Sequence, residues 1–324
     1  YDDQTNAGAP TCQSGKAYTR CRANVRQGTE RGRGQLLRIL REDDLGAQRI
    51  ESVRPSDAKC WAVRMSARGY AYTTINNNKR SLKAAFYTAV QDDLVRKNPF
   101  DFKLSDVIEN DTKSKEPLSA EQEEALLSFV RTDRVYAKHY DEVVILLGTG
   151  LRISELCGLT RADIDLESRC VCVDHQLLKG RDGHYYVDAP KTKSGERVVY
   201  MSLRVYEAFQ RVLVRDSYRQ PVVIDGRSDF LFLNTKGLPM LAQGYASVFR
   251  GMKRKYEKGD RPALPAVMTP HTLRHTFCTN MANKGMNPKA LQYVMGHTDI
   301  KMTLGYYAHT TTETAMDEMR RIVA

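Results

Sequence analysis

Two short segments near the C-terminal end of the sequence collect side chains that can act together on a phosphate. One is HTLRH at 271–275, and the other is Gly296-His297, which is followed ten residues after the histidine by Tyr307. A third, GLRISE at 150–155, lies upstream and adds Arg152. Two guanidinium groups can grip one phosphate, imidazoles can move protons and a phenol can attack phosphorus. This inventory fits phosphoryl transfer to a tyrosine that needs no metal or other cofactor.

The charge of the chain indicates where such a phosphate would be found. The formal net charge is +11, and the sequence pI is about 9.3. A polyanionic partner is expected, and DNA or RNA is favoured over a membrane because the sequence has no basic amphipathic tail and no run of 18 apolar residues. Lysines and arginines that only solvate the surface are the alternative that charge alone leaves open.

The seven cysteines and the histidine spacing argue against a disulfide framework or a metal site. The cysteines are odd in number and have no C-x-x-C spacing, which indicates reduced thiols in a cytoplasmic protein. His271 and His275 are four residues apart but lack the glutamate of H-E-x-x-H, so we expect no metal. The sequence begins at Tyr1 and not at Met, from which we expect a fragment that lacks an N-terminal part.

The elements that must position these side chains fall into two expected domains. Polar residues 1–13 are expected to be a linker or an N-terminal extension, and 14–103 a helical domain. That domain has one helix from near Thr29, another from Pro55 and a long one from about Thr73 to Val95. The polar stretch 104–117 is the predicted interdomain linker. Ser119 and Gln122 then form a capping box that opens the second domain, 118–324.

A small sheet is expected in the otherwise helical second domain. The strand signature appears at 169–175, 184–189 and 197–201. The last two are separated by residues 190–196, predicted to be a hairpin turn with Lys191 and Lys193. After residues 230–232 the chain looks helical to an amphipathic tail at its end. The predicted fold class is mainly α with a small antiparallel β-sheet, built as an all-helical domain followed by an α+β domain.

The order of these motifs resembles the tyrosine recombinase (phage integrase) family. The resemblance covers essentially 117–324, and extends more loosely to the helical region, which is similar to the family's core-binding (SAM-like) domain. Within the family, the chain is most similar to integrases of Gram-positive conjugative transposons, which carry an additional arm-binding N-terminal domain. The resemblance implies a catalytic domain of the tyrosine recombinase fold and a C-shaped clamp around duplex DNA.

The resemblance also implies a role for each residue of the site. Tyr307 would be the nucleophile that forms a 3′-phosphotyrosine, and it is preferred to Tyr306 because it precedes Ala-His. Arg152 and Arg274 would bind the non-bridging oxygens of the phosphate. Glu155 lies on the same helical face as Arg152 and would hold it in place.

Three further residues complete the implied site. His271 would assist proton transfer, and His297 would donate a hydrogen bond to a phosphate oxygen. Lys193 would protonate the 5′-oxygen leaving group, with Lys191 as the alternative lysine. His275 is interpreted as structural.

Cations on two helices and in the turn are candidate contacts to the DNA backbone. Such contacts position a protein on DNA without reading its sequence. For any single cation, a solvated helix face is the alternative. The candidates are Lys79, Arg80, Lys83, Lys191, Arg250, Lys253 and Arg254.

The implied function is site-specific DNA recombination by the integrase/excisionase of a mobile element. The reaction would pass through a Holliday junction without metal or ATP, in the bacterial cytoplasm at the nucleoid. The expected partners are the mobile-element ends, the target DNA, an accessory excision factor and further copies of the chain, joined through the tail into a synaptic tetramer. The alternatives are a chromosome-dimer resolvase, a type IB topoisomerase-like enzyme or a non-catalytic DNA-binding protein of the same fold.

Overall fold

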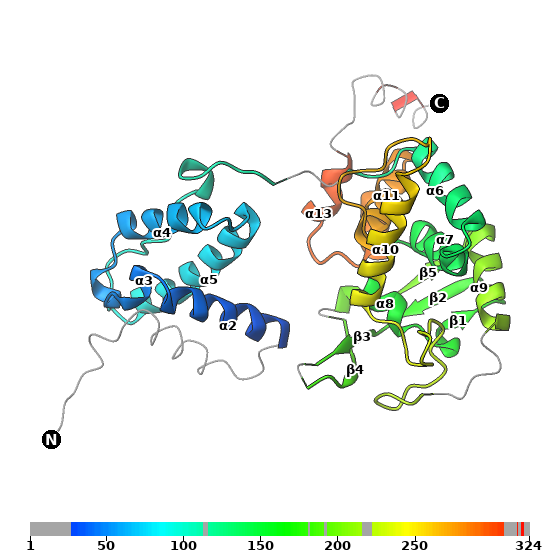
Figure 1. The fold of residues 1–324 in the computed structure, drawn as a ribbon, viewed down its shortest axis with the longest axis horizontal. Coiled ribbons are helices and arrows are strands. Elements are labelled where there is room, and N and C mark those ends of the chain that lie inside the picture. Colours follow the sequence, from blue (N-terminus) through cyan, green and yellow to red (C-terminus); the bar gives the residue numbers. More distant parts are fainter. Residues whose placement is uncertain are drawn as a thin grey trace. The chain divides into compact units, whose positions relative to one another are not determined.

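The computed structural model describes two compact units, Tyr1–Ser114 and Lys115–Ala324 (Figure 1). The described residues are 27–112, 116–180, 182–190, 193–215, 222–307, 316 and 319–320. The predicted N-terminal extension and nearly all of the predicted tail helix lie outside them. The division between the two units falls inside the predicted linker of 104–117. Each unit has its own hydrophobic core.

The elements of the first unit, over its described residues, are all helices, as the sequence predicted. Its helices are α2 (Gln27–Arg41), α3 (Asp44–Ala47), α4 (Pro55–Ala67) and α5 (Tyr72–Gln91), with short 3-10 helices η1 (Ile50–Ser52) and η2 (Leu104–Asp106). Aromatic rings fill the centre of this unit. Trp61 and Phe100 meet edge to face with ring centroids 5.9 Å apart, and Phe86 lies 5.3 Å from Phe100.

Two predicted boundaries in this unit differ from the structure. The long helix α5 ends at Gln91 and not near Val95, because Asp93 takes a left-handed backbone conformation with φ 56°. Residues from 104 onwards do not leave the unit at once, because Leu104 and Ile108 are buried in its core. Two apolar side chains in a polar stretch were too weak a signal to place the start of the linker.

The second unit consists mainly of helices (Figure 1). These helices carry most of the side chains in its hydrophobic core. The predicted capping box is confirmed: the Ser119 hydroxyl accepts from the Gln122 amide at 3.1 Å, and α6 begins at the next residue. Helix α7 is apolar on nearly every side and packs against α9 and α11. The helices are α6 (Ala120–Thr132), η3 (Ala137–His139), α7 (Tyr140–Thr149), α8 (Ile153–Gly158), η4 (Arg161–Asp163), α9 (Leu203–Arg215), α10 (Ala242–Tyr256), α11 (Pro270–Asn283), α12 (Pro288–Met295), α13 (Lys301–Leu304) and η6 (Gly305–Tyr307).

The strands of the second unit form two small antiparallel sheets. One has the order β1 (Ile164–Asp165), β2 (Cys170–Val173), β5 (Arg197–Tyr200), and the other pairs β3 (Gln176–Lys179) with β4 (Tyr185–Asp188). The three predicted strands are present as β2, β4 and β5, and β1 and β3 were not predicted. Helix α9 was not predicted either.

The predicted hairpin over 190–196 is wrong, because the strands on its two sides belong to different sheets. Strand β4 pairs with β3, and β5 pairs with β2 in the register Val171 to Val199. The true hairpin turn precedes β4, where Gly183 has φ 88°. Residues 190–196 instead connect the two sheets, and their described part holds the 3-10 turn η5 (Lys193–Gly195). None of the described helices combines the length and the apolarity needed to cross a membrane.

Candidate active site

The turn between α7 and α8 places Arg152 and its carboxylate partner. Gly150 ends α7 in the left-handed conformation with φ 64°, and a Cβ there would lie 2.4 Å from Cδ1 of Phe277. Arg152 then precedes α8, and its backbone amide donates to Oε2 of Glu155 at 2.7 Å. Its Nη1 donates to Oε1 of the same carboxylate at 2.7 Å. The predicted contact between Arg152 and Glu155 is therefore present.

Arg274 reaches the same place from α11, which begins with Pro270. Its side chain is buried, Nη1 donates to the Gly150 carbonyl at 2.6 Å, and Nη2 donates to the Met295 carbonyl. Arg152 is held alongside, because its Nη2 donates to the Gly296 carbonyl at 2.8 Å. The two guanidinium groups thus share the short segment at the end of α12.

Burial makes the region around Arg274 receptive to an anion. Loss of solvation, together with the positive charges of Arg152 and Arg197, lowers the pKa of Arg274 to about 9. A phosphate bound between the arginines would offset that repulsion. Beside Arg152 is a cavity of about 320 Å³, lined by Ser154, Glu155, Gln176, Pro190, Gly195, Gly296 and Thr298.

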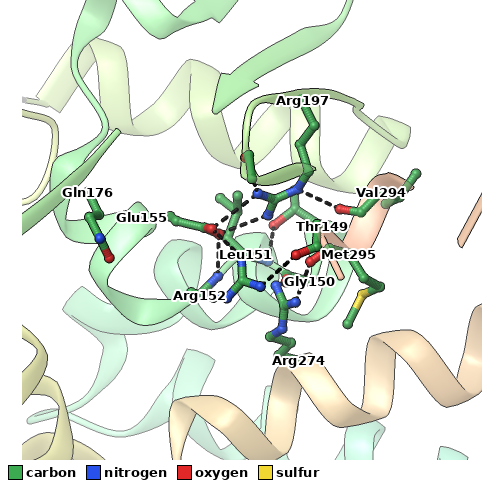
Figure 2. A network of polar contacts seen from close by, with 12 residues as sticks. Thr149, Gly150, Leu151, Arg152, Glu155, Gln176, Arg197, Arg274, Val294 and Met295 are labelled. Atoms are coloured by element: carbon green, nitrogen blue, oxygen red, sulfur yellow. Dashed lines mark hydrogen bonds and ion pairs between the residues drawn. The ribbon is translucent and has the colours of Figure 1, made fainter. Parts of the chain in front are cut away.

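Arg197 is a member of this network that sequence reasoning missed. Its side chain is fully buried, and its Nη1 and Nη2 donate to the two oxygens of Glu155 at 3.1 and 2.8 Å (Figure 2). Glu155 therefore bridges Arg152 and Arg197, and these hydrogen bonds and charges hold the pKa of its buried carboxyl below its usual value. The only sequence signal was an arginine at the start of a predicted strand, because its partners are distant along the chain.

His297 follows the left-handed residue Gly296 and is 5% exposed. Its Nδ1 lies 3.0 Å from Oγ1 of Thr303. Burial, followed by the positive charges of Arg274 and Arg152, lowers the pKa of His297 to about 4. The ring is therefore neutral at physiological pH and can donate one hydrogen bond from one nitrogen.

The other two predicted histidines lie on α11. His271 is exposed at the second position of the helix, and when protonated it would contribute to the lowered pKa of His297. The His275 ring packs against Tyr306, with centroids 4.8 Å apart. This contact is consistent with the structural role predicted for His275.

The two adjacent tyrosines on η6 have different surroundings. The Tyr307 hydroxyl donates to the Met286 carbonyl, in the loop between α11 and α12. Tyr306 lies on His275, and Arg274 is near enough to counter in part the rise in the Tyr306 pKa that burial causes. Burial also raises the pKa of Tyr307. The structure thus brings Arg152, Glu155, Arg274 and His297 together, with the Tyr307 hydroxyl bound to a backbone carbonyl.

The structure describes the two candidate lysines less completely than the other site residues. Lys193 begins the turn η5, but its side chain lies outside what the structure describes, as does all of Lys191. Gly195, two residues after Lys193, lines the cavity beside Arg152. The backbone that carries Lys193 is therefore part of the site.

The predicted DNA contacts are not equally available at the surface. Lys79 is 6% exposed, and its Nζ lies 4.5 Å from the centre of the Phe102 ring. It shares the buried face of α5 with Leu82 and Phe86, so the structure contradicts its prediction as a surface phosphate contact. Lys83 is paired with Asp101, and Lys253 with Glu257 at 2.6 Å, whereas Arg80, Arg250 and Arg254 are exposed.

One group of possible metal ligands occurs among the described residues, formed by Asp163, Asp174 and His175. Nη2 of Arg227 lies 2.9 Å from Asp174, and its Nη1 lies 3.6 Å from Asp163. Nδ1 of His175 lies 2.5 Å from Asp174. Arg227 therefore balances the charge of the two carboxylates, and His175 is hydrogen-bonded to one of them.

Known proteins are similar to this chain in sequence. The phage integrase family matches residues 116–314. The transposase from transposon Tn916 of Enterococcus faecalis is 56% identical over 311 residues, which are 96% of this chain and 76% of that protein. The XerC tyrosine recombinase of Bacillus subtilis is 23% identical over 271 residues, which are 83% of this chain and 80% of that protein.

Solved structures agree with the sequence comparison. The Tn1549 transposon integrase in complex with a circular intermediate DNA, an arginine-to-lysine variant, has a TM-score of 0.93 and 55% identity over 97% of this chain and 99% of that chain. A lambda integrase dimer bound to a core site has a TM-score of 0.64 at 13% identity, over 93% of this chain and 77% of that chain, and shares the fold. The chain therefore belongs to the phage integrase family and is a tyrosine recombinase.

Proposed function

We propose that this chain is the site-specific recombinase of a mobile element, which cuts and rejoins duplex DNA through a covalent 3′-phosphotyrosine at Tyr307. The observation that carries the proposal is the pair of guanidinium groups, Arg152 and Arg274, fixed by backbone carbonyls beside a neutral His297. A preorganised set of donors of this kind suits a phosphate whose negative charge grows during the reaction.

The proposed chemistry removes one proton from the attacking oxygen and gives one proton to the leaving oxygen. The Tyr307 oxygen attacks phosphorus and gives its proton to His271, while the bond between phosphorus and the 5′-oxygen breaks. The Lys193 ammonium donates a proton to that oxygen, which leaves as a 5′-hydroxyl. Because the phosphodiester becomes a protein–DNA ester, a 5′-hydroxyl from a partner strand can reverse the attack without ATP or a metal.

His297 would support this reaction as a hydrogen-bond donor. If Nδ1 accepts from the Thr303 hydroxyl, the neutral ring carries its proton on Nε2. That proton would be directed to a non-bridging oxygen alongside the two arginines. Thr303 would thus select the tautomer of His297 in the same way that partners of metal-bound histidines fix theirs.

The Tyr307 hydroxyl must exchange its partner before it can react. In the structure it donates to the Met286 carbonyl, which is not a base strong enough to activate a phenol. We propose that binding of DNA breaks this hydrogen bond and moves the Tyr307 hydroxyl in line with the scissile phosphate. The hydroxyl is then next to His271 and the arginines.

The substrate we propose is duplex DNA at the ends and target site of a mobile element. The Tn1549 integrase has been solved with circular intermediate DNA and with transposon right-end DNA, the latter as a tyrosine-to-phenylalanine variant. Exposed Arg80, Arg250 and Arg254 are the proposed contacts to the DNA backbone.

We further propose a synaptic tetramer of this chain, joined through the C-terminal tail. An accessory excision factor is a further proposed partner, and the proposed place of action is the bacterial cytoplasm at the nucleoid.

A nicked suicide substrate tests the nucleophile. Cleavage of such a substrate releases a short strand that cannot religate, so the covalent adduct accumulates and can be counted on a denaturing gel. We expect the wild type and Tyr306→Phe to form the adduct, and Tyr307→Phe to form none because it lacks the attacking oxygen. An adduct in Tyr307→Phe would contradict the proposal, and its loss in Tyr306→Phe alone would move the nucleophile to Tyr306.

A further inference from the structure

Arg197 ties together three segments that carry proposed catalytic residues. Besides Glu155, its Nε donates to the Val294 carbonyl at 2.6 Å, three residues before His297. Its Nη1 also donates to the Gly195 carbonyl at 3.0 Å, two residues after Lys193. One buried guanidinium therefore spans α8, the end of α12 and the turn η5.

The turn η5 is packed closely enough that its position depends on these contacts. A Cβ on Gly296 would lie 3.0 Å from the Ser194 carbonyl oxygen, 3.2 Å from Nη1 of Arg197 and 3.4 Å from Nη1 of Arg152. A Cβ on Gly195 would lie 2.2 Å from Cβ of Pro190. The turn thus lies against the residue that precedes His297, with no space for a side chain between them.

We propose that Arg197 is a positioning residue for protonation of the leaving group: it fixes the turn that carries Lys193 against the arginine pair. This inference rests on the proposed function, and it assigns to Arg197 no contact with DNA. When Arg197 is replaced, we expect the turn η5 to lose its fixed position, and with it the delivery of a proton from Lys193 to the 5′-oxygen. Attack by Tyr307 then proceeds with slow departure of an unprotonated 5′-oxygen.

A change of leaving group separates this role from a general loss of structure. A DNA substrate with sulfur in place of the bridging 5′-oxygen releases a 5′-thiolate, which departs without a proton because a thiol is far more acidic than an alcohol. The rate of adduct formation is measured in single turnover on the oxygen and the sulfur substrate. Dividing one rate by the other for each variant cancels any fraction of enzyme that is misfolded.

The experiment uses five proteins: wild type, Arg197→Lys, Lys193→Ala, Arg274→Lys and the double variant Lys193→Ala/Arg197→Lys. We expect Lys193→Ala and Arg197→Lys to lose about 100-fold on the oxygen substrate, the range for a lost general acid, and to recover most of that loss on sulfur. Arg274→Lys is the matched control, because it weakens binding of non-bridging oxygens and should lose equally on both substrates. We also expect the double variant Lys193→Ala/Arg197→Lys to be no slower than Lys193→Ala.

Two results would overturn the role of Arg197. One is an equal loss on both substrates in Arg197→Lys, which would place it with the control. The other is no recovery on sulfur in Lys193→Ala, since the turn would then carry no acid to position. Both remain distinct from failure of the proposed function, which would appear as no adduct through Tyr307 in the wild type on either substrate.

Discussion

At the scale of single residues, the site works by placing unlike charges close together out of water. Glu155 is almost fully buried between Arg152 and Arg197, and removing one partner would leave an uncompensated charge there. His297 is kept neutral by the same positive surroundings. The charges of these groups are therefore coupled, and we expect protonation of one of them to change the free energy of unfolding.

The lowered pKa of His297 predicts a specific loss of stability in acid. The unfolded histidine binds a proton below about pH 6.5, whereas the folded one does not until about pH 4. Stability from this group is therefore present above pH 6.5 and is lost as the pH falls towards 4. Between these values we expect the wild type to lose up to about 3 kcal/mol more unfolding free energy than His297→Gln, which cannot titrate. Urea unfolding at several pH values measures this, and parallel curves for the two proteins would disprove it.

At the scale of elements, two left-handed glycines bring the arginines together. Gly150 ends α7 and Gly296 ends α12, and the carbonyls of both receive arginine donors. Such helix ends favour glycine because other residues pay for a positive φ. The glycines thus set both the path of the backbone and the direction of the carbonyls that hold the guanidinium groups.

Gly296→Ala tests whether close packing at this position matters beyond backbone strain. Gly237→Ala is a matched control, because Gly237 has φ 77° but nothing lies within 4 Å of its Cβ position. Both substitutions should cost about 1 kcal/mol of stability for the left-handed backbone. We expect only Gly296→Ala to slow adduct formation, by at least about tenfold, the effect of a misplaced catalytic group. Equal rates in the two variants would show that the contact with the Ser194 carbonyl is unimportant.

Local sequence signals predicted most elements, and missed those fixed by distant contacts. The capping box at Ser119 and the Arg152–Glu155 pair depend on residues three apart, so they can be recognised in sequence. The pairing of β4 with β3 depends on burial of Leu177 and on the turn at Gly183, which the polar run 190–196 obscured. Arg197 could not be found locally, because its partner Val294 is 97 residues away.

At the scale of the whole molecule, the two units have separate cores. Trp61, Phe86 and Phe100 belong to one, and Phe209 and Phe249 to the other. Cores without shared residues can unfold in separate steps. This arrangement suits a DNA-binding enzyme in which one unit holds the catalytic residues and the other adds binding surface.

A core substitution in each unit tests this independence by calorimetry. Phe86 and Phe209 are both almost fully buried, so replacement of either by alanine should cost about 3–5 kcal/mol. We expect Phe86→Ala to lower the melting temperature of one transition and Phe209→Ala that of the other. A single transition that moves as a whole in both variants would contradict separate unfolding of the two units.

The central claim is that Tyr307 becomes covalently joined to DNA at a site built by Arg152, Arg274 and His297. The most direct measurement is mass spectrometry of the peptides released from the trapped adduct, formed in the presence of EDTA and digested with protease and nuclease. The account predicts a nucleotide 3′-phosphate attached to Tyr307 in full yield despite the chelator. A nucleotide on Tyr306 or on any other residue, or an adduct that forms only when EDTA is omitted, would contradict it.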